Sequence, residues 1–160
     1  MQETEYNPLS RIDRNILRIV QREGRISYVE LAKRVGLSTT PCTERVRKLE
    51  KAGVIRGYSA NLDPGQLGAG LVVFVQIRLS RTSPANFAEF REAAERLPQI
   101  QECYLVSGNF DYLIKARVAT MSAYRAFLGD TLLNLPGVDS STSIVVMETV
   151  TETLEIPVPD

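Results

Sequence analysis

The chain has 160 residues with 19 Lys and Arg, 19 Asp and Glu and no histidine, so its formal net charge is zero. The lack of histidine removes the commonest general base and metal ligand, and no apolar run approaches the roughly 18 residues of a membrane span. The N-terminal residues "MQETEYNPLS" have no signal-peptide pattern. We therefore expect a cytoplasmic protein that is not an enzyme and that needs no metal or cofactor.

Residues 1–61 form a basic half of the chain, with 12 Lys and Arg against 7 Asp and Glu, whereas residues 62–160 hold 7 against 12. Such asymmetry favours a polyanionic partner, such as nucleic acid, for the basic half. We expect two domains, 1–61 and 62–160. The two cysteines, Cys42 and Cys103, lie far apart in sequence and predict small buried residues, not a disulfide.

Two short helices are predicted first. Apolar residues at helical spacing place the first helix between a Ser10 cap and about Gly24. The second starts with the capping box Ser27-x-x-Glu30 and stops at Gly36. The side chains of the second helix expected to point inward are Tyr28, Leu31, Ala32 and Val35.

A third helix begins within "STTP", where Ser38 or Thr40 can act as the cap, and runs to Gly53. The short glycine-containing turn before it predicts a helix-turn-helix. A helical wheel places one apolar group on the buried side, namely Cys42, Val46 and Leu49. The opposite side presents Thr40, Glu44, Arg47 and Lys51, with Lys48 beside them.

We interpret this polar side as a DNA-reading surface, because the second helix of a helix-turn-helix enters the major groove. Arg47 suits a guanine edge, Glu44 suits cytosine or the orientation of Arg47, and neighbouring Lys and Arg suit phosphates. The residues predicted to bind DNA are Lys33, Arg34, Ser38, Thr39, Thr40, Thr43, Glu44, Arg45, Arg47, Lys48 and Lys51. The alternative is a solvated helix face carrying a Glu44–Lys48 pair.

The segment "VIRGYSANLDP" is expected to be a linker strand that ends in a turn at Asp63-Pro64-Gly65. Beyond it, the patterns predict the order βαββαβ, a ferredoxin-like split motif. Its strands are "LVVFVQIRL", "IQECYLVS", "DYLIKARV" and "SSTSIVVMETV", and its two helices end near Pro98 and Pro136. The fold class is therefore α+β.

Two helices cover only one face of such a sheet, yet the other face carries Val72 and Phe74, and the last strand is apolar on both sides across residues 144–147. We expect a second copy of the chain to cover this surface in a two-fold dimer. Such a dimer pairs two reading helices, as palindromic DNA half-sites require. Shielding by the linker or the tail is the alternative.

Seven segments carry a family resemblance: "RIDRNIL", "EGRIS", "VELAKRVGLS", "TPCTERVRKLE", "LVSGNFDYL", "MSAYR" and "LLNLPGV". From about Arg11 to Val150 the chain resembles the Lrp/AsnC, or feast/famine, family of transcription regulators. The resemblance implies a winged-helix-like helix-turn-helix and a C-terminal domain that dimerises, assembles further into rings such as octamers, and binds an amino acid between dimers. A cytoplasmic, nucleoid-associated regulator of amino-acid metabolism is expected.

The hairpin "VSGNFDYL" on its own favours a simple turn at Gly-Asn. The resemblance instead implies an effector site there. Backbone N–H groups near Asn109 can hold a carboxylate, and Asp111 can accept from an ammonium group. The implied effector residues are Gly108, Asn109, Phe110, Asp111, Met121, Val145 and Val146. The apolar neighbours predict leucine or alanine as the effector, whose binding changes assembly and so changes how reading helices are displayed along DNA.

Two other classes of function stay open. One is an architectural DNA-binding protein that wraps DNA without an effector. The other is a regulatory subunit of a metabolic enzyme, since βαββαβ domains serve many functions. The second must explain the basic N-terminal half, and the sequence offers no Ser/His, Cys/His or metal-ligand constellation to support it.

Overall fold

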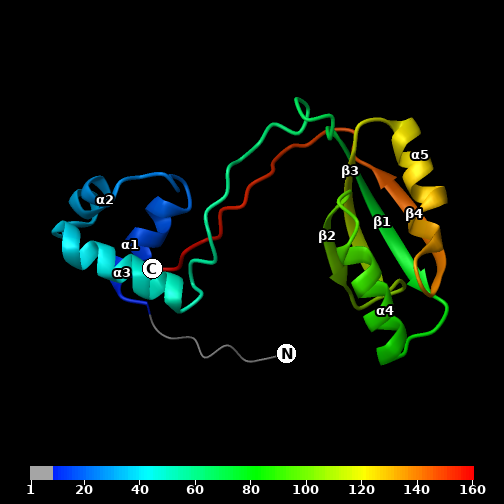
Figure 1. The fold of residues 1–160 in the computed structure, drawn as a ribbon, viewed down its shortest axis with the longest axis horizontal. Helices are drawn as coiled ribbons and strands as arrows, with labels where there is room; N and C mark the ends of the chain where they lie inside the picture. Colours follow the sequence, from blue (N-terminus) through cyan, green and yellow to red (C-terminus); the bar gives the residue numbers. More distant parts are fainter. Residues whose placement is uncertain (1–8) are drawn as a thin grey trace. The chain divides into compact units, whose positions relative to one another are not determined.

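The computed structural model describes residues 9–160, which form two compact units (Figure 1). One unit contains residues 9–61 together with Glu152–Asp160, and the other is Leu62–Thr151. The last nine residues, which the sequence assigned to the second domain, thus group with the first unit, because they bond to Arg18 in its first helix and to Arg22 just after that helix. Within the described residues, no helix is both long and apolar enough to cross a membrane.

The first unit holds three helices, α1 (Arg11–Val20), α2 (Tyr28–Val35) and α3 (Thr39–Lys51). The Ser10 and Ser27 caps are confirmed, since each hydroxyl accepts a hydrogen bond from the backbone three residues on. Gly36 ends α2 in the left-handed region, at φ 72°, which a side chain disfavours. The N–H of Leu37 then donates to the Ala32 carbonyl at 2.9 Å, which closes the turn into α3.

The core of the first unit joins all three helices. Its buried residues are Ile16, Val20, Leu31, Ala32, Cys42, Val46 and Leu49. The predicted buried side of α3 is therefore confirmed. Tyr28 was predicted to point inward but is 41% exposed, because it opens α2 one turn before the side chains that reach the core.

The first residues of the linker after α3 pack on the helices of the first unit. Ile55 packs on its core, and the Tyr58 hydroxyl donates to the Glu50 carboxylate at 3.0 Å. The predicted linker strand is absent from residues 54–70, because no described segment pairs with them and a strand needs a partner. The predicted turn at Asp63 does form, with its carboxylate accepting from the N–H of Gly65 at 2.8 Å.

The second unit is an α+β domain with a four-stranded antiparallel sheet in the order β2-β3-β1-β4, which confirms the ferredoxin-like prediction. Its elements are β1 (Leu71–Leu79), α4 (Pro84–Glu95), β2 (Ile100–Leu105), β3 (Tyr112–Val118), α5 (Met121–Asp130), the short 3-10 helix η1 (Leu132–Asn134) and β4 (Val138–Val145). β4 stops at Val145, earlier than predicted, because its partner β1 begins at Leu71 and offers few further residues to pair with.

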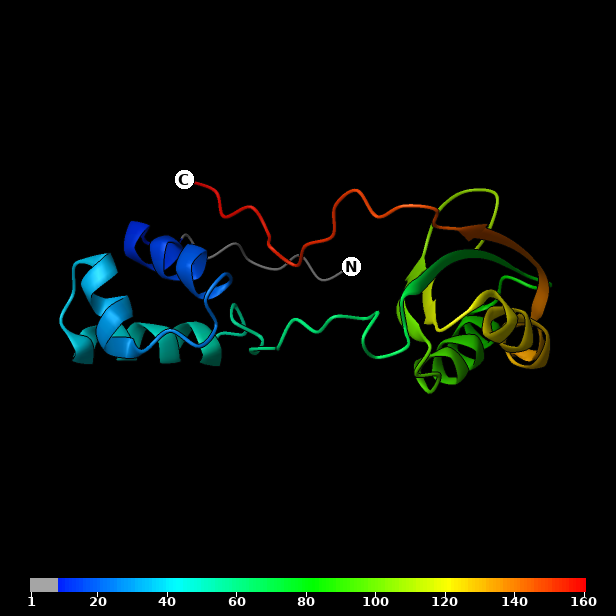
Figure 2. The same ribbon diagram turned by 90° about the horizontal axis from the view of Figure 1, so that it is seen from above.

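Both helices lie on the same side of the sheet (Figure 2). Alternate residues of β1, namely Val73, Val75, Ile77 and Leu79, are buried in the core that these helices cover. In that core Phe90 of α4 stacks on Tyr112 of β3 at a centroid distance of 4.3 Å. On the other face Val72 is buried, but Ile144 is 46% exposed. Cys103 was predicted to be buried yet is exposed, because β2 lies at the edge of the sheet.

Candidate nucleic-acid interface and ligand site

The exposed side of α3 carries the residues that the sequence singled out for DNA. Thr40, Glu44, Arg47, Lys48 and Lys51 are all exposed, opposite the buried apolar side of the same helix. Among the residues that the structure describes, no ion pair joins Glu44 to Lys48. Both side chains are therefore available to contact DNA. It presents hydrogen-bonding and cationic groups on a rigid helix, which is the form a major-groove reader takes.

The predicted DNA-binding cations divide into two sets. Arg34 donates to Glu23 at 2.6 Å and to Glu30 at 3.1 Å, and these hydrogen bonds raise the pKa of its guanidinium. Arg45 donates to Asp13 at 3.0 Å, which ties α3 to α1. The remaining four have no ion-pair partner within residues 9–160; they are Lys33, Arg47, Lys48 and Lys51. These four can therefore meet phosphates or bases without breaking an internal pair.

The N-terminus of α3 carries hydroxyl groups. Ser38 is the N-cap but its side chain makes no capping bond, and both Thr39 and Thr40 are exposed. Thr43 donates back to the Thr39 carbonyl at 2.9 Å and keeps its acceptor lone pairs. The first turn contains no acidic residue, so the positive end of the helix dipole is uncompensated. A phosphate or a base edge suits this end of α3.

The hairpin residues that the sequence predicted to bind the effector are held by hydrogen bonds to β1. The Asp111 carboxylate accepts from the N–H of Leu79 at 2.7 Å, and the Asp111 N–H donates to the Ile77 carbonyl at 2.9 Å. Arg78 donates to the carbonyl of Asn109, a contact that no local sequence pattern signals. The hairpin group, defined as Gly108, Asn109, Phe110 and Asp111, is thereby fixed to the last residues of β1.

The other predicted effector residues lie at the opposite end of the sheet. This strand-end group consists of Met121, Val145 and Val146. Val145 pairs with Val73, and the Val146 N–H donates to the Val72 carbonyl, near the start of β1. Asp111 reaches β1 at Leu79, six residues further along, or about 20 Å at about 3.3 Å per strand residue.

Met121 belongs at the same end, since α5 begins three residues after Val118, which pairs with Leu71. Met121 is 47% exposed and Val145 is 38% exposed, so both present apolar surface. One chain therefore does not bring the hairpin group and the strand-end group together. The part of the chain described also contains no cluster of His, Cys, Asp or Glu able to hold a metal.

Two family descriptions match this chain and together cover most of it. The Lrp/AsnC ligand-binding domain matches residues 72–156, and a winged helix-turn-helix DNA-binding domain matches residues 9–56. The first match falls mainly on the sheet-containing unit and the second on the three-helix unit.

Relatives of known name agree with these matches. The chain is 61% identical over 142 residues to the leucine-responsive regulatory proteins of Klebsiella pneumoniae and Escherichia coli strain K12, which covers 89% of this chain and 87% of each relative. Among solved structures, a transcriptional regulator from Neisseria meningitidis in complex with L-Met has a TM-score of 0.89 and 34% identity, covering 94% of this chain and 97% of that one. An AsnC family regulator from Agrobacterium tumefaciens has a TM-score of 0.89 and 38% identity, covering 93% and 97%.

Proposed function

Since the chain belongs to the Lrp/AsnC family and is a transcription regulator with a DNA-binding helix-turn-helix and an amino-acid-binding domain, we propose that its effector is a small apolar amino acid, leucine or alanine. The strand-end group is apolar and has no formal charge with which to select a charged side chain. The names of the 61% identical relatives support leucine, and a more distant relative was solved with L-Met. We further propose that the protein acts by binding alone, on nucleoid DNA in the cytoplasm.

The observation that carries the ligand proposal is the separation of the two effector groups along β1. The hairpin group offers backbone N–H groups and the Asp111 carboxylate for the polar end of an amino acid. The strand-end group offers apolar side chains for its other end. Because about 20 Å separates the two groups in one chain, we propose that the hairpin of one copy meets the strand end of another, so that the site is complete only in an assembly.

DNA recognition is assigned to α3. We propose that Arg47, Glu44, Thr40 and Thr43 meet base edges, and that Ser38, Thr39, Lys33, Lys48 and Lys51 hold phosphates. Arg34 and Arg45 keep α2 and α3 in place through their carboxylate partners. A two-fold dimer presents two α3 helices to palindromic half-sites, and dimers assemble further, with the octamer as the expected size.

One experiment tests the effector and assembly proposals together. Binding to the protein's own promoter region and the mass of the oligomer are measured against each of the twenty amino acids. We expect leucine or alanine to shift both quantities. If every amino acid leaves both unchanged while sequence-selective DNA binding remains, the protein is an effector-independent architectural protein and the ligand proposal is wrong.

A further inference from the structure

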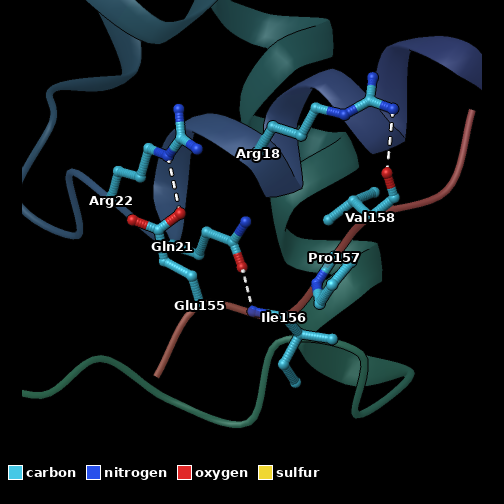
Figure 3. A pocket seen from close by; sticks show the side chains of 7 residues that line it. All are labelled: Arg18, Gln21, Arg22, Glu155, Ile156, Pro157 and Val158. Carbon is cyan, nitrogen blue, oxygen red and sulfur yellow. Dashed lines mark hydrogen bonds and ion pairs between the residues drawn. The ribbon is translucent and has the colours of Figure 1, made fainter. Parts of the chain in front are cut away.

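The C-terminal tail, residues 152–160, belongs to the first unit, and its residues 155–158 lie beside Arg18 of α1 and beside Gln21 and Arg22, which follow that helix (Figure 3). One guanidinium nitrogen of Arg18, Nη2, donates to the Val158 carbonyl at 3.0 Å, to the Pro159 carbonyl at 3.3 Å and to the Asp160 carboxylate at 2.6 Å. The other nitrogen, Nη1, donates to Asn15 one turn earlier at 3.1 Å, which orients the guanidinium. Arg18 therefore binds all of the last three residues of the chain.

A second set of contacts holds the tail just beyond the end of α1. Arg22 donates to the Glu155 carboxylate at 2.9 Å, and the N–H of Ile156 donates to the side-chain carbonyl of Gln21 at 3.1 Å. Arg18 lies in the last turn of α1, and Gln21 and Arg22 form the cap and turn that follow it. The tail is thus bonded to the C-terminal end of α1 through its last three residues and to the turn after α1 through Glu155 and Ile156.

The sequence "IPVPD" favours an extended conformation of the tail, which suits this contact. Pro157 and Pro159 fix their own φ angles, and each restricts the residue before it to extended conformations. An extended, stiff segment loses little conformational entropy when it lies along a helix. Its free carbonyl groups then point to donors such as Arg18.

The contact is polar, not apolar. Leu154 and Ile156 remain 85% and 66% exposed, so hydrogen bonds and ion pairs carry the interaction. Ion pairs between exposed side chains are screened by salt and hold their partners weakly. The ion pairs Arg18–Asp160 and Arg22–Glu155 are of this kind, so the free energy that separates the docked tail from a released one is small.

The tail also follows closely in sequence after the candidate ligand site. β4 ends at Val145, and only residues 146–151 separate it from the tail, a span of at most about 25 Å when fully extended. Val145 and Val146 belong to the strand-end group. The chain therefore enters the first unit twice, once before residue 62 and again from Glu152.

We propose that residues 152–160 form a strap, and that its docking on Arg18 and Arg22 couples occupancy of the amino-acid site to the DNA-binding unit. The proposal rests on the proposed function at one point, the placing of Val145 and Val146 in the effector site. Effector binding at the end of β4 biases the balance between a docked and a released tail, and tail docking biases effector affinity by the same factor.

The first test measures docking without any effector. Hydrogen exchange of the Ile156 amide is followed in the full-length protein and in the double variant Arg18→Gln, Arg22→Gln. We expect exchange to be at least about fivefold faster in the variant, since the Ile156 N–H loses its place beside Gln21. The matched control is Arg11→Gln, Arg25→Gln, which removes two exposed charges from the same unit and should leave exchange unchanged. Equal exchange in wild type and the double variant overturns the strap.

The second test measures coupling. The effector-induced change in DNA affinity should fall at least about fivefold in the double variant, which is the lower end of ordinary allosteric coupling, while ligand-free DNA affinity stays as in the control. Arg22→Glu should lose the response, and adding Glu155→Arg should restore it. An undiminished response in the double variant overturns the proposal. If the wild type responds to no amino acid, the proposed function fails, yet the exchange experiment still decides whether the tail docks.

Discussion

The Asp111 carboxylate accepts a hydrogen bond from the backbone N–H of Leu79, 2.7 Å away. The bond forms where the pairing of β1 with β4 shifts register between Arg78 and Leu79, so the carboxylate satisfies an N–H beside this irregularity. Asp111 is therefore a structural residue as well as a candidate effector ligand, and variants must separate the two roles.

Asp111→Ala should lower the free energy of unfolding by about 1.5–3 kcal/mol, because a charge-assisted hydrogen bond is lost and the Leu79 N–H loses its acceptor. Asp111→Asn keeps an acceptor oxygen and should cost less than half of that in urea denaturation. It should nevertheless lose the amino-acid response, since the negative charge facing the ammonium group is gone. An Asp111→Asn protein that responds as the wild type does would remove Asp111 from the ligand set.

Arg47→Ala should reduce affinity for the best DNA site by about 1–3 kcal/mol and relax the preference at one base position. Lys51→Ala should weaken binding to all sequences equally and lower the slope of affinity against salt by about 1. Binding to a panel of single-base variants over a range of salt checks both. If Arg47→Ala weakens every site alike, its contact is to phosphate.

Asp13→Asn should remove part of the acid sensitivity of the first unit. Burial by itself raises the pKa of the Asp13 carboxyl, but hydrogen bonds from Ser10 and Arg45 and the charge of Arg45 outweigh it and lower the pKa below 3.8. The stabilisation is therefore present above the ordinary value and is lost as pH falls through the lower folded-state value. Denaturation midpoints measured downward from neutral pH should fall less steeply in Asp13→Asn, and parallel curves would contradict the assignment.

Tyr58→Phe should remove an alkaline transition. Burial, together with the hydrogen bond and charge of Glu50, raises the pKa of Tyr58 to about 12 from its ordinary value of 10.0. The folded state holds the phenol proton more tightly than the unfolded chain, so this stabilisation is complete below pH 10.0 and is lost as pH rises to about 12. Unfolding midpoints across this range should drop more in the wild type than in Tyr58→Phe.

Cys103 should be the thiol that alkylating reagents reach in the native protein. Cys103 is an exposed residue while Cys42 is buried. Loss of water around the sulfur raises the pKa of both thiols, and the negative charge of Glu95 raises that of Cys103 further, so the reaction should be slow near neutral pH and faster in alkali. Mass spectrometry should find one label before unfolding and two after it. In Cys103→Ser the native protein should take up no label, and native labelling of Cys42 would contradict the packing of α3.

The parts of the fold that follow from local spacing could be predicted. The buried side of α3 follows from the positions of Cys42, Val46 and Leu49, and the alternation of β1 follows from period two. Tyr28 has the same spacing as Leu31 and Ala32 but lies at a helix end, where spacing does not report burial. The end of β4 depends on where β1 begins, which is a property of the pair and not of either strand.

The candidate sites were predictable only in part for the same reason. A helical wheel separates Arg47 from Val46, but it does not show that Arg45 is held by Asp13, 32 residues earlier. The hairpin signal at Gly108 identifies the turn, whereas the distance to Val145 depends on sheet register. The docking of the tail on Arg18 joins residues 142 positions apart, and no periodic pattern carries such a contact.

The separation of the hairpin group from the strand-end group has a quantitative consequence for sensing. If each copy supplies half of a binding site, the number of complete sites depends on how many copies have met, and apparent affinity for the amino acid rises with protein concentration. The cell's own supply of the regulator then becomes a second input, so that the same pool of amino acid gives different signals in cells that hold few or many copies.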